Sequence, residues 1–103
     1  QIFEQFKVDF AIIGASAMDL DGDVMDYDLA EVRVSKTILR QARQTFLVCD
    51  QSKLHRSAPV RLASLSEIDT LFTDKVLPDE LRRRCTDWET QVIVADSRSS
   101  GPT

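Results

Sequence analysis

Short apolar runs separated by polar segments predict a small parallel sheet. Four runs have the length of a strand and are rich in aliphatic, β-branched and aromatic residues: Phe10–Ile13, Thr45–Cys49, Thr70–Thr73 and Gln91–Ala95. They are continuous rather than alternating, so we expect strands that are covered on both faces, as in a parallel sheet. A fifth run, Val60–Leu65, alternates for part of its length and predicts an edge strand.

Helical spacing of apolar residues occurs between these runs. It predicts one helix from about Leu29 to Arg43, with Asp28 as its N-cap. A second helix is expected to begin at Pro78 and to reach about Cys85, because proline and acidic residues favour the first turn. This order of elements predicts an α/β fold: an open, mostly parallel, Rossmann-like sheet with flanking helices, in which ligands bind at the carboxyl ends of the strands.

Composition and charge narrow the possible functions. The chain has 103 residues, of which 43% are hydrophobic and 29% charged, typical of one globular domain. We expect that domain to occupy residues 1–95, followed by a disordered polar tail at 96–103. The net charge of −4 argues against direct nucleic-acid binding. Two cysteines and no long apolar segment favour a reduced, cytoplasmic protein without membrane contact.

The most acidic stretch, from Asp19 to Glu31, suggests calcium at first sight. An EF-hand loop counted from Asp19 would need glycine at position six and glutamate at position twelve, where the chain has Val24 and Ala30. A tight turn at Asp21-Gly22 accounts better for this stretch. We therefore predict no metal site.

Two segments that directly follow predicted strands are candidate ligand-binding sites. Small residues at Gly14–Ala17 would let a ligand approach the backbone, although a plain turn is the alternative. At Asp50–Lys53, an acid, a hydroxyl and a lysine suit a phosphorylated polyol; the alternative is a short helical turn capped by Asp50 and Ser52. His55, the single histidine, is expected at the surface, and Cys49 in the core.

Five blocks stand in a characteristic order: Asp9–Gly14, Ser16–Asp19, Glu31–Arg33, Val48–Lys53 and Ile68–Asp74. Together, from about Val8 to Ala95, they resemble the C-terminal effector-binding domain of DeoR-family transcriptional regulators. The resemblance implies a fold related to sugar-phosphate isomerases and deaminases and to CoA-transferases. It also implies a phosphorylated sugar or polyol as effector, with glycerol 3-phosphate favoured, and DNA binding through a separate N-terminal helix-turn-helix domain.

By the same resemblance, the effector-binding residues are Gly14, Ala15, Ser16, Asp19, Glu31, Asp50 and Lys53. Glu31 would lie near the rim of the pocket, and Lys53 is the first candidate for binding phosphate. The family loop commonly reads Ser-Gly-Ile-Asp, whereas Ala17 and Met18 occupy its middle positions here. The substitution of that glycine removes one point at which the backbone could contact the ligand closely.

Enzymes related to this family have an Asp-Gly-His element after the glycine loop, and this chain has Met18-Asp19-Leu20 instead. We therefore expect binding without catalysis and without a cofactor. Two alternatives remain open: an isomerase or deaminase that uses Asp19 or Asp50 as its base, and an oligomerisation domain with a vestigial pocket. Because the first residue is Gln1, we expect the chain to be the C-terminal part of an effector-binding domain in a longer, homo-oligomeric protein.

Overall fold

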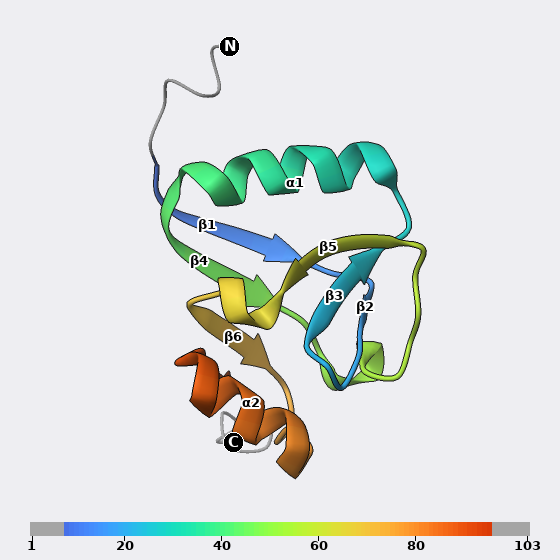
Figure 1. Cartoon of the computed structure of the whole chain (residues 1–103), viewed down its shortest axis with the longest axis vertical. Helices are drawn as coiled ribbons and strands as arrows, with labels where there is room; N and C mark the ends of the chain where they lie inside the picture. Colours follow the sequence, from blue (N-terminus) through green and yellow to red (C-terminus); the bar gives the residue numbers. More distant parts are fainter. Residues whose placement is uncertain (1–7, 96–103) are drawn as a thin grey trace, which may run out of the picture.

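The computed structural model describes residues 8–95 and arranges them as two sheets and two helices (Figure 1). The elements in chain order are β1 (Val8–Gly14), β2 (Ala17–Met18), β3 (Asp23–Asp26), α1 (Leu29–Gln41), β4 (Ala42–Val48), η2 (Gln51–Lys53), β5 (Val60–Ser64), η3 (Leu65–Glu67), β6 (Thr70–Thr73), α2 (Asp79–Trp88) and β7 (Gln91–Val94). The predicted α/β fold with a mainly parallel sheet is confirmed. The tail predicted at 96–103 lies outside the described residues.

The four apolar runs form one parallel sheet in the order β1-β4-β6-β7. Asp28 caps α1 as predicted, because its carboxylate accepts hydrogen bonds from the N–H groups of Ala30 and Glu31. The helix ends at Gln41 rather than Arg43, and β4 begins at the next residue. Ala42 has extended backbone and pairs with β1, so strand pairing replaces the last part of the predicted helix.

The second helix is longer than predicted and ends at Trp88 instead of Cys85. Most residues of this helix are polar, so its apolar residues alone do not indicate its full length. Ion pairs one turn apart stabilise the helix: Arg82 with Asp79, and Arg84 with Glu80. Glu89 has left-handed backbone, and its N–H donates to the carbonyls of Cys85 and Thr86, so the helix ends there.

A three-stranded antiparallel sheet, β2-β3-β5, is the part of the fold that the sequence did not predict. The tight turn predicted at Asp21-Gly22 is confirmed as the link between β2 and β3, with Gly22 at φ +89°. The edge strand predicted at Val60–Leu65 is present as β5, and it lies at the edge of this second sheet.

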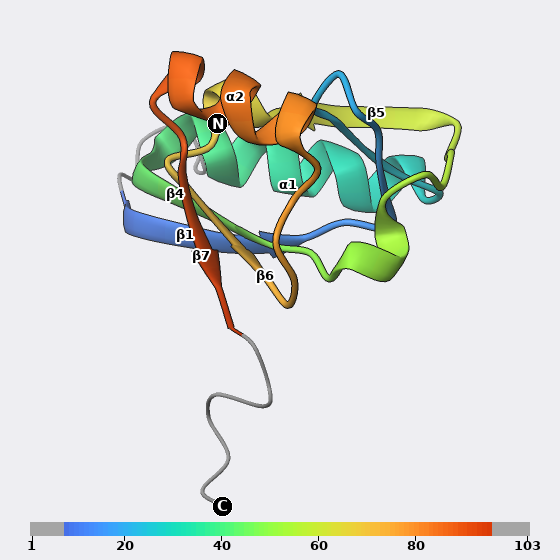
Figure 2. The ribbon, with the colours of Figure 1, turned by 90° about the horizontal axis from the view of Figure 1, so that it is seen from below.

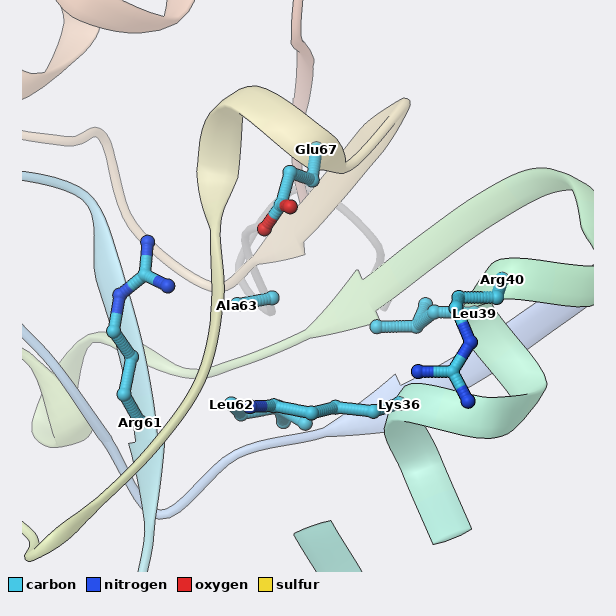
Figure 3. Close-up of a pocket in the computed structure, with 7 residues that line it drawn as sticks. All are labelled: Lys36, Leu39, Arg40, Arg61, Leu62, Ala63 and Glu67. Atoms are coloured by element: carbon cyan, nitrogen blue, oxygen red, sulfur yellow. The ribbon is translucent and has the colours of Figure 1, made fainter. Parts of the chain in front are cut away.

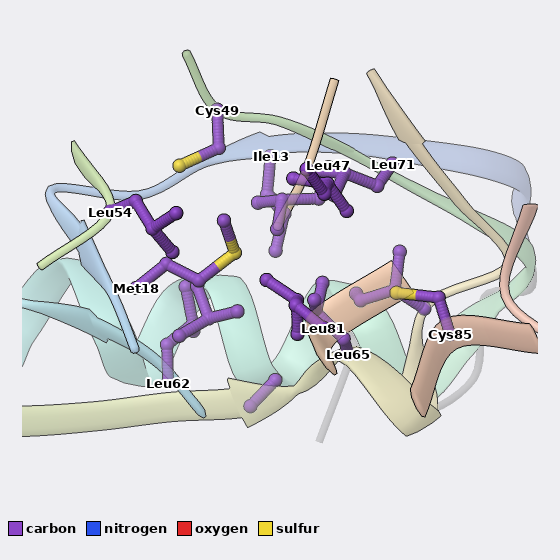
Figure 4. Close-up of a cluster of buried hydrophobic side chains, with 14 of the residues drawn as sticks. Ile13, Met18, Leu47, Cys49, Leu54, Leu62, Leu65, Leu71, Leu81 and Cys85 are labelled. Carbon is purple, nitrogen blue, oxygen red and sulfur yellow. The ribbon is translucent and has the colours of Figure 1, made fainter. Parts of the chain in front are cut away.

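The core lies between the parallel sheet and a layer formed by α1, α2 and the antiparallel sheet (Figure 2). Fully buried side chains from both layers meet there (Figure 4): Met18, Leu47, Leu65, Leu71, Leu81 and Cys85. The expectation that both faces of the parallel sheet are covered is wrong within residues 8–95. On the second face Phe10 is 58% exposed and Ile12 is 62% exposed.

Candidate ligand-binding site

The loops predicted to bind ligand begin at one edge of the parallel sheet. Gly14 pairs with Val48, Val48 with Phe72, and Phe72 with Ile93, so these strands end within one residue of the same line across the sheet. The segments that follow β1, β4 and β6 therefore start side by side. This edge holds the carboxyl ends of the strands, where open α/β sheets bind their ligands.

Asp50 organises the loop after β4. Its carboxylate accepts hydrogen bonds from the N–H of Ser52, at 3.1 Å, and from the Ser52 hydroxyl, and it caps η2. The Ser52 hydroxyl bond is the main reason that the pKa of Asp50 is lowered, and the positive charges of Lys53 and Arg56 act in the same direction. The short helical turn expected as the alternative is present and is capped by Asp50, whereas Ser52 lies inside it. The Asp50 carboxylate remains exposed and ionised beside two cations.

The loop after β6 is joined to this segment by two hydrogen bonds. The Gln51 N–H donates to the Asp74 carboxylate at 2.7 Å, and its side-chain amide donates to the Val76 carbonyl at 2.8 Å. The seven residues expected to bind the effector did not include Gln51, Asp74 or Arg56, although Gln51 lies within the candidate segment Asp50–Lys53. One signal for Asp74 was available in the sequence, since an acidic residue directly follows a predicted strand there.

The loop after β1 is also held against the loop after β4. The His55 N–H donates to the Met18 carbonyl at 3.1 Å, and Met18 forms a parallel bridge with Leu54. His55 is exposed, as predicted, and has left-handed backbone with φ 71°. These contacts bring the Gly14–Ser16 and Asp50–Lys53 segments into one surface.

Within the first loop, Ser16 already has partners. Its N–H donates to the Met25 carbonyl at 3.1 Å, and its hydroxyl donates to the Asp26 carboxylate at 2.9 Å. The Ser16 amide is therefore not available to an anion, although its oxygen can still accept. Gly14 is exposed, and a Cβ there would be 3.8 Å from the Val48 carbonyl oxygen, an ordinary contact.

Within residues 8–95, no hydrogen bond or ion pair joins Asp19 or Glu31 to the loop after β4. The Asp19 carboxylate accepts hydrogen bonds from the N–H groups of Asp21 and Asp23, at 3.0 and 2.9 Å, and orders the β2–β3 turn. Glu31 is exposed in the first turn of α1. Within residues 8–95 neither residue has a hydrogen bond or ion pair with Asp50 or Lys53, so their roles in binding stay predictions.

Cys49 immediately precedes Asp50 and is 1% exposed, as predicted for a core residue. Burial, with a smaller effect of the Asp50 charge, raises the pKa of its thiol to about 11. The thiol is therefore uncharged at neutral pH and is a poor nucleophile.

A separate hollow of about 390 Å³ lies between α1 and the β5–η3 segment (Figure 3). Lys36 and Arg40 reach it from α1, and Arg61 from β5. Arg61 also pairs with Asp23 at 3.0 Å, while Glu67 places a carboxylate on the rim. None of the seven candidate residues lines this hollow.

The part of the chain that the structure describes has neither a metal-binding cluster nor a membrane-spanning helix. No group of three histidine, cysteine, aspartate or glutamate residues there could hold a metal ion. The helices of the same region are too short or too polar to cross a membrane.

The fold is an open α/β sheet with candidate ligand-binding loops at the carboxyl ends of its strands, and comparison with known proteins identifies its family. The family model for the DeoR C-terminal sensor domain matches residues 1–75, and the chain belongs to that family. The resemblance seen in the sequence blocks is thereby confirmed.

Individual relatives are transcriptional regulators. The chain is 42% identical over 94 residues to the glycerol-3-phosphate regulon repressor of Haemophilus influenzae, with 91% of this chain and 36% of that protein covered. It is 38% identical over 88 residues to the repressor of the same name in Escherichia coli, with coverage of 85% and 35%. The HTH-type transcriptional repressor CsqR of E. coli is 34% identical over 89 residues, with coverage of 86% and 34%. The chain thus spans about a third of these relatives.

Proposed function

We propose that the chain senses a phosphorylated sugar or polyol for a transcriptional repressor, with glycerol 3-phosphate as the favoured effector. The observation that supports this most directly is the charge arrangement after β4, where Lys53 and Arg56 both act on the exposed Asp50 carboxylate. Cations bind phosphate oxygens, and a carboxylate accepts hydrogen bonds from hydroxyl groups. The names of the two glycerol-3-phosphate regulon repressors support the choice of effector.

In this proposal each loop has its own role. Lys53 is the main phosphate ligand, and Arg56 adds positive charge. Asp50 accepts from a hydroxyl of the effector, and the backbone of Gly14 and Ala15 forms the floor of the site. Ser16 offers its oxygen as an acceptor, because its hydrogen is donated to Asp26.

Asp19 and Glu31 complete the proposed set at its margin. Asp19 fixes the turn that follows β2, and Glu31 belongs to the helix that begins beyond β3. Both act on the site through the position of these elements.

Signalling would follow from a change in conformation or assembly when the effector binds. A ligand that prefers one state shifts the protein toward it, and the operator affinity of an attached helix-turn-helix domain changes accordingly. In this proposal DNA is bound only by that other domain, and the full-length protein is a homo-oligomer.

Catalysis is not part of the proposed function. The N–H groups of Asp21 and Asp23 donate to the Asp19 carboxylate and hold it in the β2–β3 turn. The relatives are named as repressors and regulators, in agreement with a binding role.

The test is an operator-binding titration of the full-length protein with glycerol 3-phosphate. We expect the ligand to lower operator affinity, and we expect Lys53→Gln to need at least about tenfold more ligand, since a charged hydrogen bond contributes about 1.5–3 kcal/mol. No response of the wild-type protein would contradict the choice of effector, and an unchanged response of Lys53→Gln would contradict the site. Turnover of a sugar phosphate would favour the isomerase or deaminase alternative.

Lys36→Gln is the matched control, because it removes the same charge from α1 at the separate hollow. Its response should equal that of the wild-type protein. If Lys36→Gln loses the response and Lys53→Gln retains it, the effector binds between α1 and β5 and the proposed site is wrong.

A further inference from the structure

Gln51 joins the loop after β4 to the loop after β6 at two points. Its backbone N–H donates to the Asp74 carboxylate at 2.7 Å, and its side-chain amide donates to the Val76 carbonyl at 2.8 Å. The two acceptors lie 23 and 25 residues further along the chain. We call this pair of hydrogen bonds the Gln51 clamp. It fixes the first residue of η2, the short helix that also contains Lys53.

The Gln51 clamp completes the capping of η2. The first N–H groups of a helix have no acceptor within the helix and need one from elsewhere. The Asp50 carboxylate accepts from the N–H of Ser52, whereas the N–H of Gln51 donates to Asp74. Asp74 follows the last residue of β6, so this acceptor comes from the neighbouring strand. The position of η2 therefore depends on a residue outside its own loop as well as on Asp50.

The loop after β6 leads directly into α2 (Figure 1). Val76 is exposed, but the next residue, Leu77, is buried in the same core cluster as Leu81 of α2. Pro78 is the N-cap of the helix, and its carbonyl accepts from the N–H of Arg82 at 2.9 Å. A displacement of the loop after β4 is therefore transferred through Val76 and Leu77 to the first turn of α2.

We propose that the Gln51 clamp transmits effector binding to α2, with Asp74 as the positioning residue for the loop after β4. This inference rests on the proposed function, in which Asp50 and Lys53 bind the effector. An effector that holds η2 in one position favours the conformation in which both bonds of the clamp are formed. Because coupling is reciprocal, a change in α2 alters the affinity for the effector by the same factor. The helix α2 is then the element through which the occupied site acts on the rest of the protein.

An aspartate at the other end of β6 offers a matched control for Asp74. The Asp69 carboxylate accepts from the N–H of Thr45, also at 2.7 Å. Asp69 precedes β6 and Thr45 belongs to β4, so this bond joins the same two strands at the amino end of the sheet. Asp74→Ala and Asp69→Ala therefore remove the same kind of hydrogen bond, and only the first of them affects the proposed site.

Hydrogen exchange of the full-length protein without effector tests the clamp itself. Relative to the amides of α1, we expect Asp74→Ala to accelerate exchange at residues 50–56 and 82–85 at least about threefold, because one bond of the clamp is lost. Asp69→Ala should not accelerate these two segments selectively. Gln51→Ala removes only the side-chain bond to Val76 and should affect the same two segments, so it replaces Asp74→Ala if that variant fails to fold. Unchanged relative exchange in either segment would overturn the proposal.

An operator-binding titration with glycerol 3-phosphate tests the effect on the site. We expect Asp74→Ala to need at least about fivefold more effector than the wild-type protein, and Asp69→Ala to need the same amount. Asp74→Asn keeps an oxygen that can accept from the Gln51 N–H, so it should need less effector than Asp74→Ala. If Asp74 acted only through its negative charge, both of its variants would bind the phosphate more tightly, and that result would overturn the proposal. No response of the wild-type protein would contradict the choice of effector, and the exchange experiment would still decide whether the clamp exists.

Discussion

A Cβ atom on Gly22 would lie 2.7 Å from the six-membered ring of Trp88. Gly22 forms the β2–β3 turn with φ +89°, and Trp88 ends α2, so this contact joins the antiparallel sheet to the second helix. Two independent constraints therefore require glycine at this position. One is the left-handed backbone, and the other is the space beside the indole ring.

We expect Gly22→Ala to lower the free energy of unfolding by about 2–4 kcal/mol, as the sum of left-handed strain and overpacking. Urea unfolding followed by circular dichroism measures this cost. Gly14→Ala is the control, because its Cβ would meet only an ordinary contact at 3.8 Å, and it should cost less than about 1 kcal/mol. In a Trp88→Leu background the cost of Gly22→Ala should fall to the strain alone; an undiminished cost would show that the ring contact is unimportant.

Glu89 gives the opposite prediction. It stands just after α2 with φ 62°, and the N–H groups of Glu89 and Thr90 bond to Thr86 and Cys85. Glycine is favoured at this position because it adopts left-handed backbone without strain. Glu89→Gly should therefore raise the free energy of unfolding by about 0.5–1 kcal/mol. Glu89→Ala removes the same charge but keeps the strain, so a gain of equal size in that variant would refute the backbone explanation.

The sequence predicted those parts of the fold whose signals are local. The four apolar runs became the strands of the parallel sheet, and Asp28 caps α1 as its position indicates. That the loops after β1 and β4 begin side by side was also predictable, since parallel strands end at one edge.

Contacts distant in sequence account for what was not predicted. β2 has two residues, too few for any periodic pattern, and it exists because Met18 pairs with Val24 and meets Leu54. Asp74 joins the site through Gln51, which lies 23 residues away. The continuous apolar pattern of the strands also suggested that both sheet faces are buried, because an apolar strand has the same sequence whether its cover is present or not.

The hydrogen bond from the Ser52 hydroxyl predicts that the pKa of Asp50 changes when this hydroxyl is removed. Because that bond is the largest cause of the lowered pKa of Asp50, Ser52→Ala should raise this pKa toward the ordinary carboxyl value. The side-chain carboxyl ¹³C shift followed against pH reports it directly. Ser66→Ala is the control, because the Ser66 hydroxyl donates to Ser64 rather than to a carboxylate. An unchanged Asp50 titration in Ser52→Ala would show that Lys53 and Arg56 dominate instead.

Burial of Cys49 predicts a loss of stability at high pH. Its pKa is raised from 9.0 to about 11, so above pH 9 the unfolded chain releases a proton that the folded protein keeps. The folded state then binds more protons than the unfolded state, and the free energy of unfolding must fall as pH rises from 9 to 11, by roughly 2 kcal/mol for this group. Well below pH 9 both the folded and the unfolded chain hold the proton, so Cys49 does not make the free energy of unfolding depend on pH there.

Cys49→Ala separates this effect from the other groups that titrate in the same range. The variant should be less stable than the wild-type protein at pH 7, because a buried side chain is shortened. Its free energy of unfolding should nevertheless fall less steeply between pH 9 and 11, so the two curves converge as pH rises. Parallel curves in urea unfolding across this range would mean that the thiol ionises equally easily in the folded and unfolded chain, contrary to its burial beside Asp50.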